Sequence, residues 1–209
     1  MGNDSELKSG TQYDLRADYQ ARWDQFVTTN QLDQHTDLLQ AFYIGEEPTW
    51  NDIDSTELKA ACDYVKLSIP EVPIMVVEAF PVLEELVVPN SVDWLGFDRY
   101  FIMDPQQDSS FQADLSIIKA KRQAHQQLVL IMDCHHFIFG HSARGIEKND
   151  MAQVAKNYYD LANAETDVVA LIGYHWPSGF EFKGVRGARN MPEHVQLEYR
   201  KIGEAITGK

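Results

Sequence analysis

Cysteine is scarce in this sequence, with only Cys62 and Cys134 among 209 residues. Two thiols make no disulfide framework, so we expect both to be buried and free, and they leave the redox compartment open. No apolar run approaches the roughly 20 residues that cross a bilayer. The polar stretch 1–10 is not expected to act as a signal peptide. The sequence therefore predicts no membrane partner.

Positively charged residues are also few. Lysine and arginine total 18 against 32 acidic residues, which gives a formal net charge of -14 and a pI of about 4.8. Such a surface repels phosphate backbones, so nucleic acid is not expected as a partner, and the plain interpretation of the charge is a solvated surface. A hydrophobic content of 44% is typical of a globular protein, and the length suits one domain over 1–209.

Apolar runs alternate with helical patterns along the chain. Because the runs are continuously apolar, they predict strands that are buried on both faces. We expect these strands over 38–44, 73–78, 92–100, 127–133 and 167–176. Helical spacing and capping residues predict helices over 13–32, 54–65, 83–87, 111–123, 150–164 and 192–206. This alternation indicates an α/β fold with parallel strands and right-handed crossovers.

Ionisable and aromatic residues gather where these strands end. The C-terminal ends of parallel strands share one edge of a sheet, and ligands bind there. The sequence therefore predicts a functional site at this edge. The strand-end residues, in chain order, are Glu46, Glu47, Trp50, Glu78, Asp98, Tyr100, Asp133, His135, His175 and Trp176.

Two of these strand-end motifs resemble those of the clan A glycoside hydrolases, the group of (β/α)8 enzymes that includes cellulases and β-galactosidases. The segment 45–48, Gly-Glu-Glu-Pro, is similar to the Asn-Glu-Pro that often ends strand four of that group. The segment 93–100 is similar to the sixth-strand pattern Asp-x-x-Gly-x-Asn-x-Tyr, with Asp98 in place of Asn. The resemblance covers 38–206 and implies a partial TIM-type (β/α) barrel of about five units, strands four to eight.

The resemblance also implies hydrolysis of a polysaccharide or oligosaccharide by paired carboxylates. Glu47 stands at the position of the acid/base, and Asp133 stands where the group has its nucleophilic glutamate, with a side chain one methylene shorter. No cofactor and no metal is implied, and the expected partner is the carbohydrate substrate. Substrate contacts are expected from Glu46, Trp50, Glu78, Asp98, Tyr100, His135, His175 and Trp176.

Two other functions stay open. Asp133 and His135, with His141 and His175 close by in the strand-end pattern, could instead serve a metal-dependent hydrolase. Adjacent His135 and His136 point to opposite sides of an extended strand, so they do not readily bind one ion together. The third alternative is a carbohydrate-binding or degenerate barrel without catalysis.

The barrel interpretation also bears on partners and location. A complete barrel has eight strands, so five strands predict exposed sheet edges and either self-association or a complementing chain. A secreted or periplasmic location would require a leader ahead of this sequence.

Overall fold

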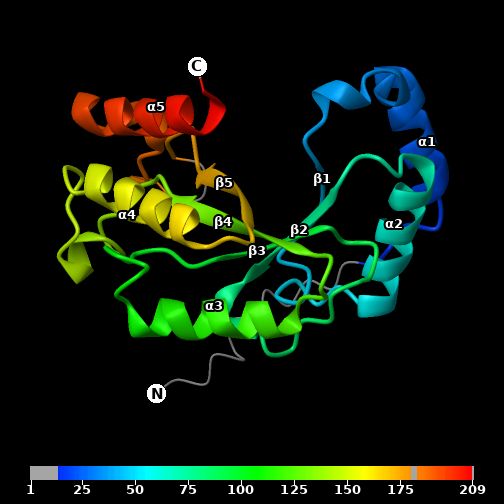
Figure 1. The fold of residues 1–209 in the computed structure, drawn as a ribbon, viewed down its shortest axis with the longest axis horizontal. Helices are drawn as coiled ribbons and strands as arrows, with labels where there is room; N and C mark the ends of the chain where they lie inside the picture. The colour runs from blue at the N-terminus through cyan, green and yellow to red at the C-terminus, as the bar shows by residue number, and fades with distance from the viewer. Residues whose placement is uncertain (1–13, 180–182, 209) are drawn as a thin grey trace. The chain divides into compact units, whose positions relative to one another are not determined.

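The computed structural model describes residues 14–179 and 183–208, in which strands and helices alternate (Figure 1). Five strands are confirmed close to the predicted ranges, and β4 has the predicted ends; β1 begins four residues later than predicted, because Thr36–Leu38 form a 3₁₀ turn. The strands are β1 (Phe42–Glu46), β2 (Ile74–Ala79), β3 (Trp94–Asp98), β4 (Gln127–Asp133) and β5 (Val168–Tyr174). The helices are α1 (Tyr19–Asn30), α2 (Ser55–Ser68), α3 (Ser109–Lys121), α4 (Met151–Ala164) and α5 (Glu193–Thr207).

The five strands form one parallel sheet in the order β1-β2-β3-β4-β5. Each strand lies beside its predecessor along the chain, with a connecting segment between successive parallel strands. Every residue of β2 is buried, which explains its almost unbroken apolar sequence. A bulge interrupts the pairing of β1 with β2 between Tyr43 and Gly45. This arrangement is that of a partial (β/α) barrel.

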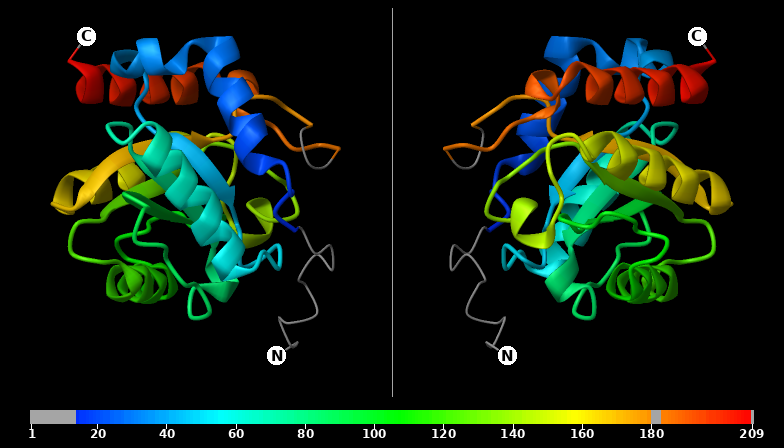
Figure 2. Two further views of the ribbon diagram at one scale, coloured as in Figure 1. Left: turned by 90° about the vertical axis from the view of Figure 1, so that its right-hand side faces the viewer. Right: turned by 90° about the vertical axis from the view of Figure 1, so that its left-hand side faces the viewer.

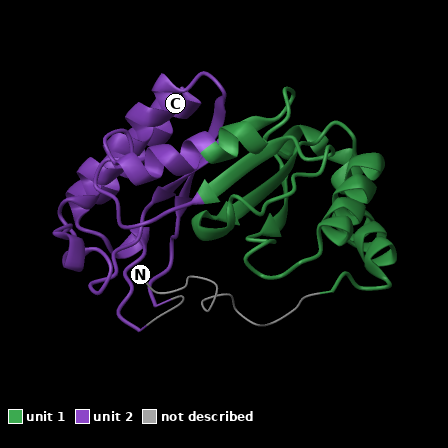
Figure 3. Cartoon of the chain, turned by 90° about the horizontal axis from the view of Figure 1, so that it is seen from below, with its two compact units in different colours: residues 1–97, 117–128 green, residues 98–116, 129–209 purple. Residues whose placement is uncertain are grey.

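The chain divides into two compact units (Figure 3). Unit 1 comprises residues 1–97 and 117–128, and unit 2 comprises 98–116 and 129–209. Within unit 1, α2 packs against β1, β2 and α1 (Figure 2). Within unit 2, α4 packs against α5 and β5. The single domain expected from chain length stays a prediction.

One helix begins where capping residues predicted it, whereas another predicted helix does not form. The Asp54 carboxylate accepts the Thr56 backbone N–H at 2.7 Å and so caps α2 as predicted. The short helix predicted over 83–87 is wrong, because a 3₁₀ turn over Phe80–Val82 and further turns take its place. Pro81 and Pro89 bracket too few residues for a stable α-helix. Among the described residues, no helix is long and apolar enough to cross a membrane.

Both cysteines are buried and free, as their sequence surroundings predict. Burial and the nearby Asp63 charge raise the pKa of the Cys62 thiol to about 12. Burial likewise raises the pKa of Cys134 above its usual range. Because the thiolate is the reactive form, these two thiols act as small apolar core groups.

Candidate functional site

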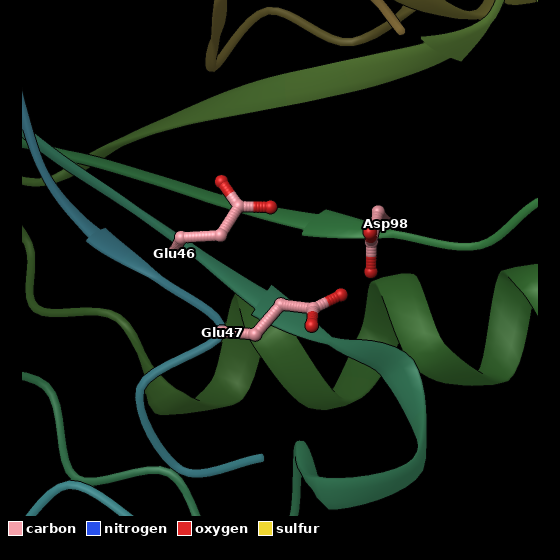
Figure 4. A group of neighbouring side chains, drawn as sticks. All are labelled: Glu46, Glu47 and Asp98. Carbon is pink, nitrogen blue, oxygen red and sulfur yellow. The ribbon is translucent and has the colours of Figure 1, made fainter. Parts of the chain in front are cut away.

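The acidic pair Glu46 and Glu47 stands at the C-terminal end of β1 (Figure 4). The Tyr43 hydroxyl donates a hydrogen bond to the Glu46 carboxylate. Residues three apart on a regular strand point to opposite faces, and the bulge between Tyr43 and Gly45 removes that alternation. The bulge in β1 therefore lets the Tyr43 hydroxyl reach the Glu46 carboxylate, beside Glu47.

Glu47 occupies an uncommon backbone conformation, with φ at 45°. A non-glycine residue in this left-handed region is destabilised by about 1–3 kcal/mol, so surrounding contacts must hold it there. The Glu47 N–H donates to the Val77 carbonyl at 2.7 Å, and its carbonyl accepts the Asn51 N–H at 2.9 Å. The Asn51 side-chain amide adds a second donor to the same carbonyl at 3.0 Å. The backbone of Glu47 is therefore held on both sides.

Glu78 lies inside unit 1 with no exposed surface. One carboxylate oxygen accepts the Thr49 N–H at 2.8 Å. The other accepts the N–H groups of Trp50 at 3.2 Å and Ala79 at 2.9 Å. Burial raises the pKa of Glu78, against the opposing effect of these hydrogen bonds. The side chain therefore serves the turn after β1, while the substrate contact predicted for Glu78 stays a prediction.

In unit 2, Asp133 ends β4 as a completely buried carboxylate. Its Oδ2 accepts the Phe101 N–H at 2.9 Å and faces His141 Nε2 at 2.9 Å. Its Oδ1 faces His135 Nδ1 at 3.0 Å. Because His141 Nδ1 accepts the Phe137 N–H at 2.9 Å, the His141 proton is assigned to Nε2, where it can be donated to Asp133.

The charge state of Asp133 follows from these partners. Burial acts to raise the pKa of this carboxyl, but the hydrogen bonds and charges of His135 and His141 outweigh burial and hold the pKa well below its usual range. Asp133 is therefore ionised across the neutral range. An ionised, fully enclosed carboxylate can orient histidines and stabilise positive charge, but it cannot donate a proton.

Aromatic rings surround this carboxylate network. Tyr100 stacks on Tyr174 with ring centroids 5.1 Å apart, and it meets the edge of His135 at 5.1 Å. Burial and the charges of Asp98 and Asp133 raise the pKa of Tyr100 well above its usual range, so the phenol stays protonated. Unit 2 therefore contains a cluster of aromatic rings in which the phenol of Tyr100 keeps its proton.

The histidines of unit 2 face different partners. His135 and His141 both aim a ring nitrogen at Asp133, whereas His136 Nε2 lies 3.1 Å from the Ile146 carbonyl. His135 and His136 have different polar neighbours, but both rings pack against His141, with ring centroids 5.1 and 5.0 Å from it. His175 is buried, and its ring lies 5.4 Å from that of His135. His141 Nε2 is hydrogen-bonded to Asp133, and His135 Nδ1 lies 3.0 Å from the same carboxylate, so the metal-dependent alternative stays a prediction.

Trp176 is the most exposed of the predicted strand-end aromatics, at 64%. The backbone around it is held by the segment that follows: Ala188 N–H donates to the His175 carbonyl at 2.9 Å, and Gly187 N–H donates to Ser178 Oγ at 3.1 Å. A Cβ on Gly187 would lie 2.0 Å from the Pro177 carbonyl oxygen. Glycine is therefore required at position 187 by close backbone approach.

Gly187→Ala is expected to destabilise the protein by about 2 kcal/mol or more, because two backbone segments must separate to admit the methyl group. Urea unfolding followed by circular dichroism measures this change. Gly203→Ala is the matched control, since a Cβ there meets nothing within 4 Å in helix α5. The control should stabilise the protein by about 0.5–1 kcal/mol. Equal midpoints for the two variants would contradict the close approach.

The structure divides the predicted site residues between the units. Glu46, Glu47, Trp50 and Glu78 belong to unit 1. Asp98, which ends β3 (Figure 4), Tyr100, Asp133, His135, His175 and Trp176 belong to unit 2. Sequence reasoning missed Tyr43 and Phe101, which contact Glu46 and Asp133. Phe101 has φ at 65°, a conformation for which a phenylalanine carries no sequence signal.

Comparisons with known proteins support the fold. No family model matches the sequence, and no curated protein matches it either. The structure is similar to that of the GH113 β-mannanase AaManA from Alicyclobacillus acidocaldarius, solved in complex with ManMIm, at a TM-score of 0.57 and 12% sequence identity. The match covers 90% of this chain and 61% of the mannanase chain. The chain therefore has the fold of part of a (β/α)8 barrel and spans about three fifths of the length of the mannanase chain.

Proposed function

We propose that this protein is a glycoside hydrolase that cleaves a polysaccharide or oligosaccharide by carboxylate catalysis. The observation that carries the proposal is the place of Glu47, directly after β1 in a fold shared with a β-mannanase. In a (β/α) barrel, residues that follow the C-terminal ends of strands form the active site. The partial burial of Glu47 and its fixed backbone suit a group that must present a proton in one direction.

Glu47 is the proposed general acid. A protonated carboxyl donates its proton to the glycosidic oxygen as the bond to the sugar breaks, and the leaving group departs as an alcohol. Water then adds to the oxocarbenium-like carbon, and the Glu47 carboxylate accepts the proton that the water gives up, which restores the acid. Glu46 lies beside it with the Tyr43 hydroxyl as a hydrogen-bond donor.

Asp133 is the proposed second carboxylate. Because Asp133 is fully buried, it would not touch the sugar; its histidine partners favour a fixed negative charge, which would stabilise the oxocarbenium-like centre through the electrostatic field rather than by contact or proton donation. Trp50, Tyr100 and Trp176 are the proposed sugar platforms, since aromatic faces pack against the apolar faces of sugar rings. Self-association or a complementing chain remains part of the proposal, because the sheet has five of the eight strands of a complete barrel.

The experiment that tests the function is release of reducing ends from a polysaccharide panel that contains mannan, xylan and β-glucan. We expect hydrolysis of at least one of them by the purified protein. Treatment with a chelator should leave this activity unchanged, because the proposed chemistry uses carboxylates alone. Activity that is lost with chelator and restored by a divalent cation would instead support the metal-dependent hydrolase. Binding to the panel without hydrolysis would support the carbohydrate-binding alternative.

A further inference from the structure

Glu78 is an unexpected charge in the most enclosed strand of unit 1. All six residues of β2 are buried, and five of them are apolar. A carboxylate in such a place is destabilising unless polar partners compensate for the lost water. Here the partners are backbone N–H groups, and two of the three belong to the turn that follows Glu47 and Pro48. The compensation therefore comes from the segment that carries the proposed acid.

The turn offers consecutive donors to this carboxylate. The Thr49 N–H donates to one oxygen at 2.8 Å, and the Trp50 N–H donates to the other at 3.2 Å. Two adjacent N–H groups that share one carboxylate fix the direction of the chain between them. Hydrogen bonds to a charged acceptor are roughly twice as strong as neutral ones. The bonds therefore restrain the backbone two and three residues beyond Glu47.

This restraint acts next to a conformation that needs support. Glu47 has φ at 45°, in the left-handed region that disfavours side chains. If the turn were released, Glu47 could relax toward an ordinary backbone conformation, and its carboxyl would leave its present position. The Asn51 hydrogen bonds to the Glu47 carbonyl lie inside the same turn. The hydrogen bonds to Glu78 instead join the turn to strand β2.

From these contacts we propose that Glu78 is a positioning residue: it anchors the 47–50 turn to β2 and thereby sets the orientation of Glu47 and Trp50. The proposal rests on the glycosidase function for its catalytic consequence. Glu78 does not contact substrate in this role, because it has no exposed surface. Its replacement should therefore affect the chemical step more than substrate binding.

The test compares Glu78→Gln with wild type in the full chain. A carboxamide keeps the shape but replaces one acceptor oxygen by a donor, so it faces one backbone N–H with an NH₂ group. We expect the amide protons of Thr49 or Trp50 to exchange with solvent about tenfold faster or more, measured by nuclear magnetic resonance without ligand. Glu71→Gln, an exposed site before β2, is the control and should leave both rates unchanged.

Kinetics on the polysaccharide that wild type hydrolyses fastest provides the second readout. In Glu78→Gln we expect kcat to fall about tenfold or more with a smaller change in KM, and the alkaline limb of the kcat/KM pH profile, which reports the acid, to move. Unchanged amide exchange would overturn the anchoring. Faster exchange with unchanged kcat and pH profile would overturn the positioning role. If wild type hydrolyses nothing, the glycosidase proposal fails, and amide exchange alone still decides whether Glu78 anchors the turn.

Discussion

Glu47→Gln is expected to lower kcat/KM for polysaccharide hydrolysis by about 10²–10⁴-fold, the usual contribution of a general acid. The amide has nearly the shape of the acid, but it cannot supply a proton to the departing glycosidic oxygen. Because Glu47 is partly exposed and its backbone contacts are unchanged by the substitution, the unfolding midpoint should stay close to that of wild type. Reducing-end release and urea unfolding measure the two quantities on the same preparation.

Substrates with different leaving groups distinguish the loss of the proton donor from general damage to the site. An aryl glycoside whose phenol is strongly acidic departs with little need of protonation, so Glu47→Gln should hydrolyse it far better, relative to wild type, than it hydrolyses the polysaccharide. Glu71→Gln, exposed and remote in the sequence from the strand ends, should match wild type on both substrates. Equal losses on both substrates, or polysaccharide activity within about threefold of wild type, would reject the acid role.

Asp133→Asn is expected to destabilise the protein by about 1–3 kcal/mol, because the amide cannot replace both acceptor oxygens of a buried hydrogen-bond network. The substitution keeps the volume but leaves His135 and His141 without the carboxylate that their ring nitrogens face. The urea midpoint of unfolding measures the loss. Asp160→Asn, which breaks an exposed ion pair with Lys156 on α4, is the matched control and should change the midpoint little.

The pH dependence of the free energy of unfolding tests the charge of Asp133 independently. The pKa of Asp133 is lower in the folded protein than the unfolded value of about 3.9, so its contribution is fully present above that pH. The contribution is lost as the pH falls through the folded pKa, because protonation then favours the unfolded chain. Wild type should therefore lose unfolding free energy below about pH 4 more steeply than Asp133→Asn does. Parallel curves for the two proteins would contradict an ionised, stabilising Asp133.

The fold was largely readable from the order of residues. Continuous apolar runs predicted the strands because both faces of a parallel sheet are covered, and β4 matches its predicted ends of 127 and 133. Capping chemistry at Asp54 predicted the start of α2, since that contact lies within two residues. The short helix over 83–87 failed because weak helical spacing between two prolines does not outweigh turn formation.

The site could be predicted only in outline. Strand-end placement and the family resemblance predicted Glu47 and Asp133 as the carboxylate pair, and this pair stays a prediction. The partners of these groups come from distant positions: Glu78 reaches Thr49, and Asp133 reaches Phe101. Such contacts depend on register and on backbone conformations that carry no local signal.

What the sequence alone determined is therefore the set of elements and the strand ends at which chemistry can occur, because periodicity and capping act over a few residues. Tertiary structure decided how deeply each carboxylate is buried and which groups it contacts. Glu78 looks like a site residue in the sequence, yet packing encloses it and directs its oxygens to backbone N–H groups. Asp133 stands at the nucleophile position of the family pattern in the sequence, and its burial beside two histidines became apparent only in the structure.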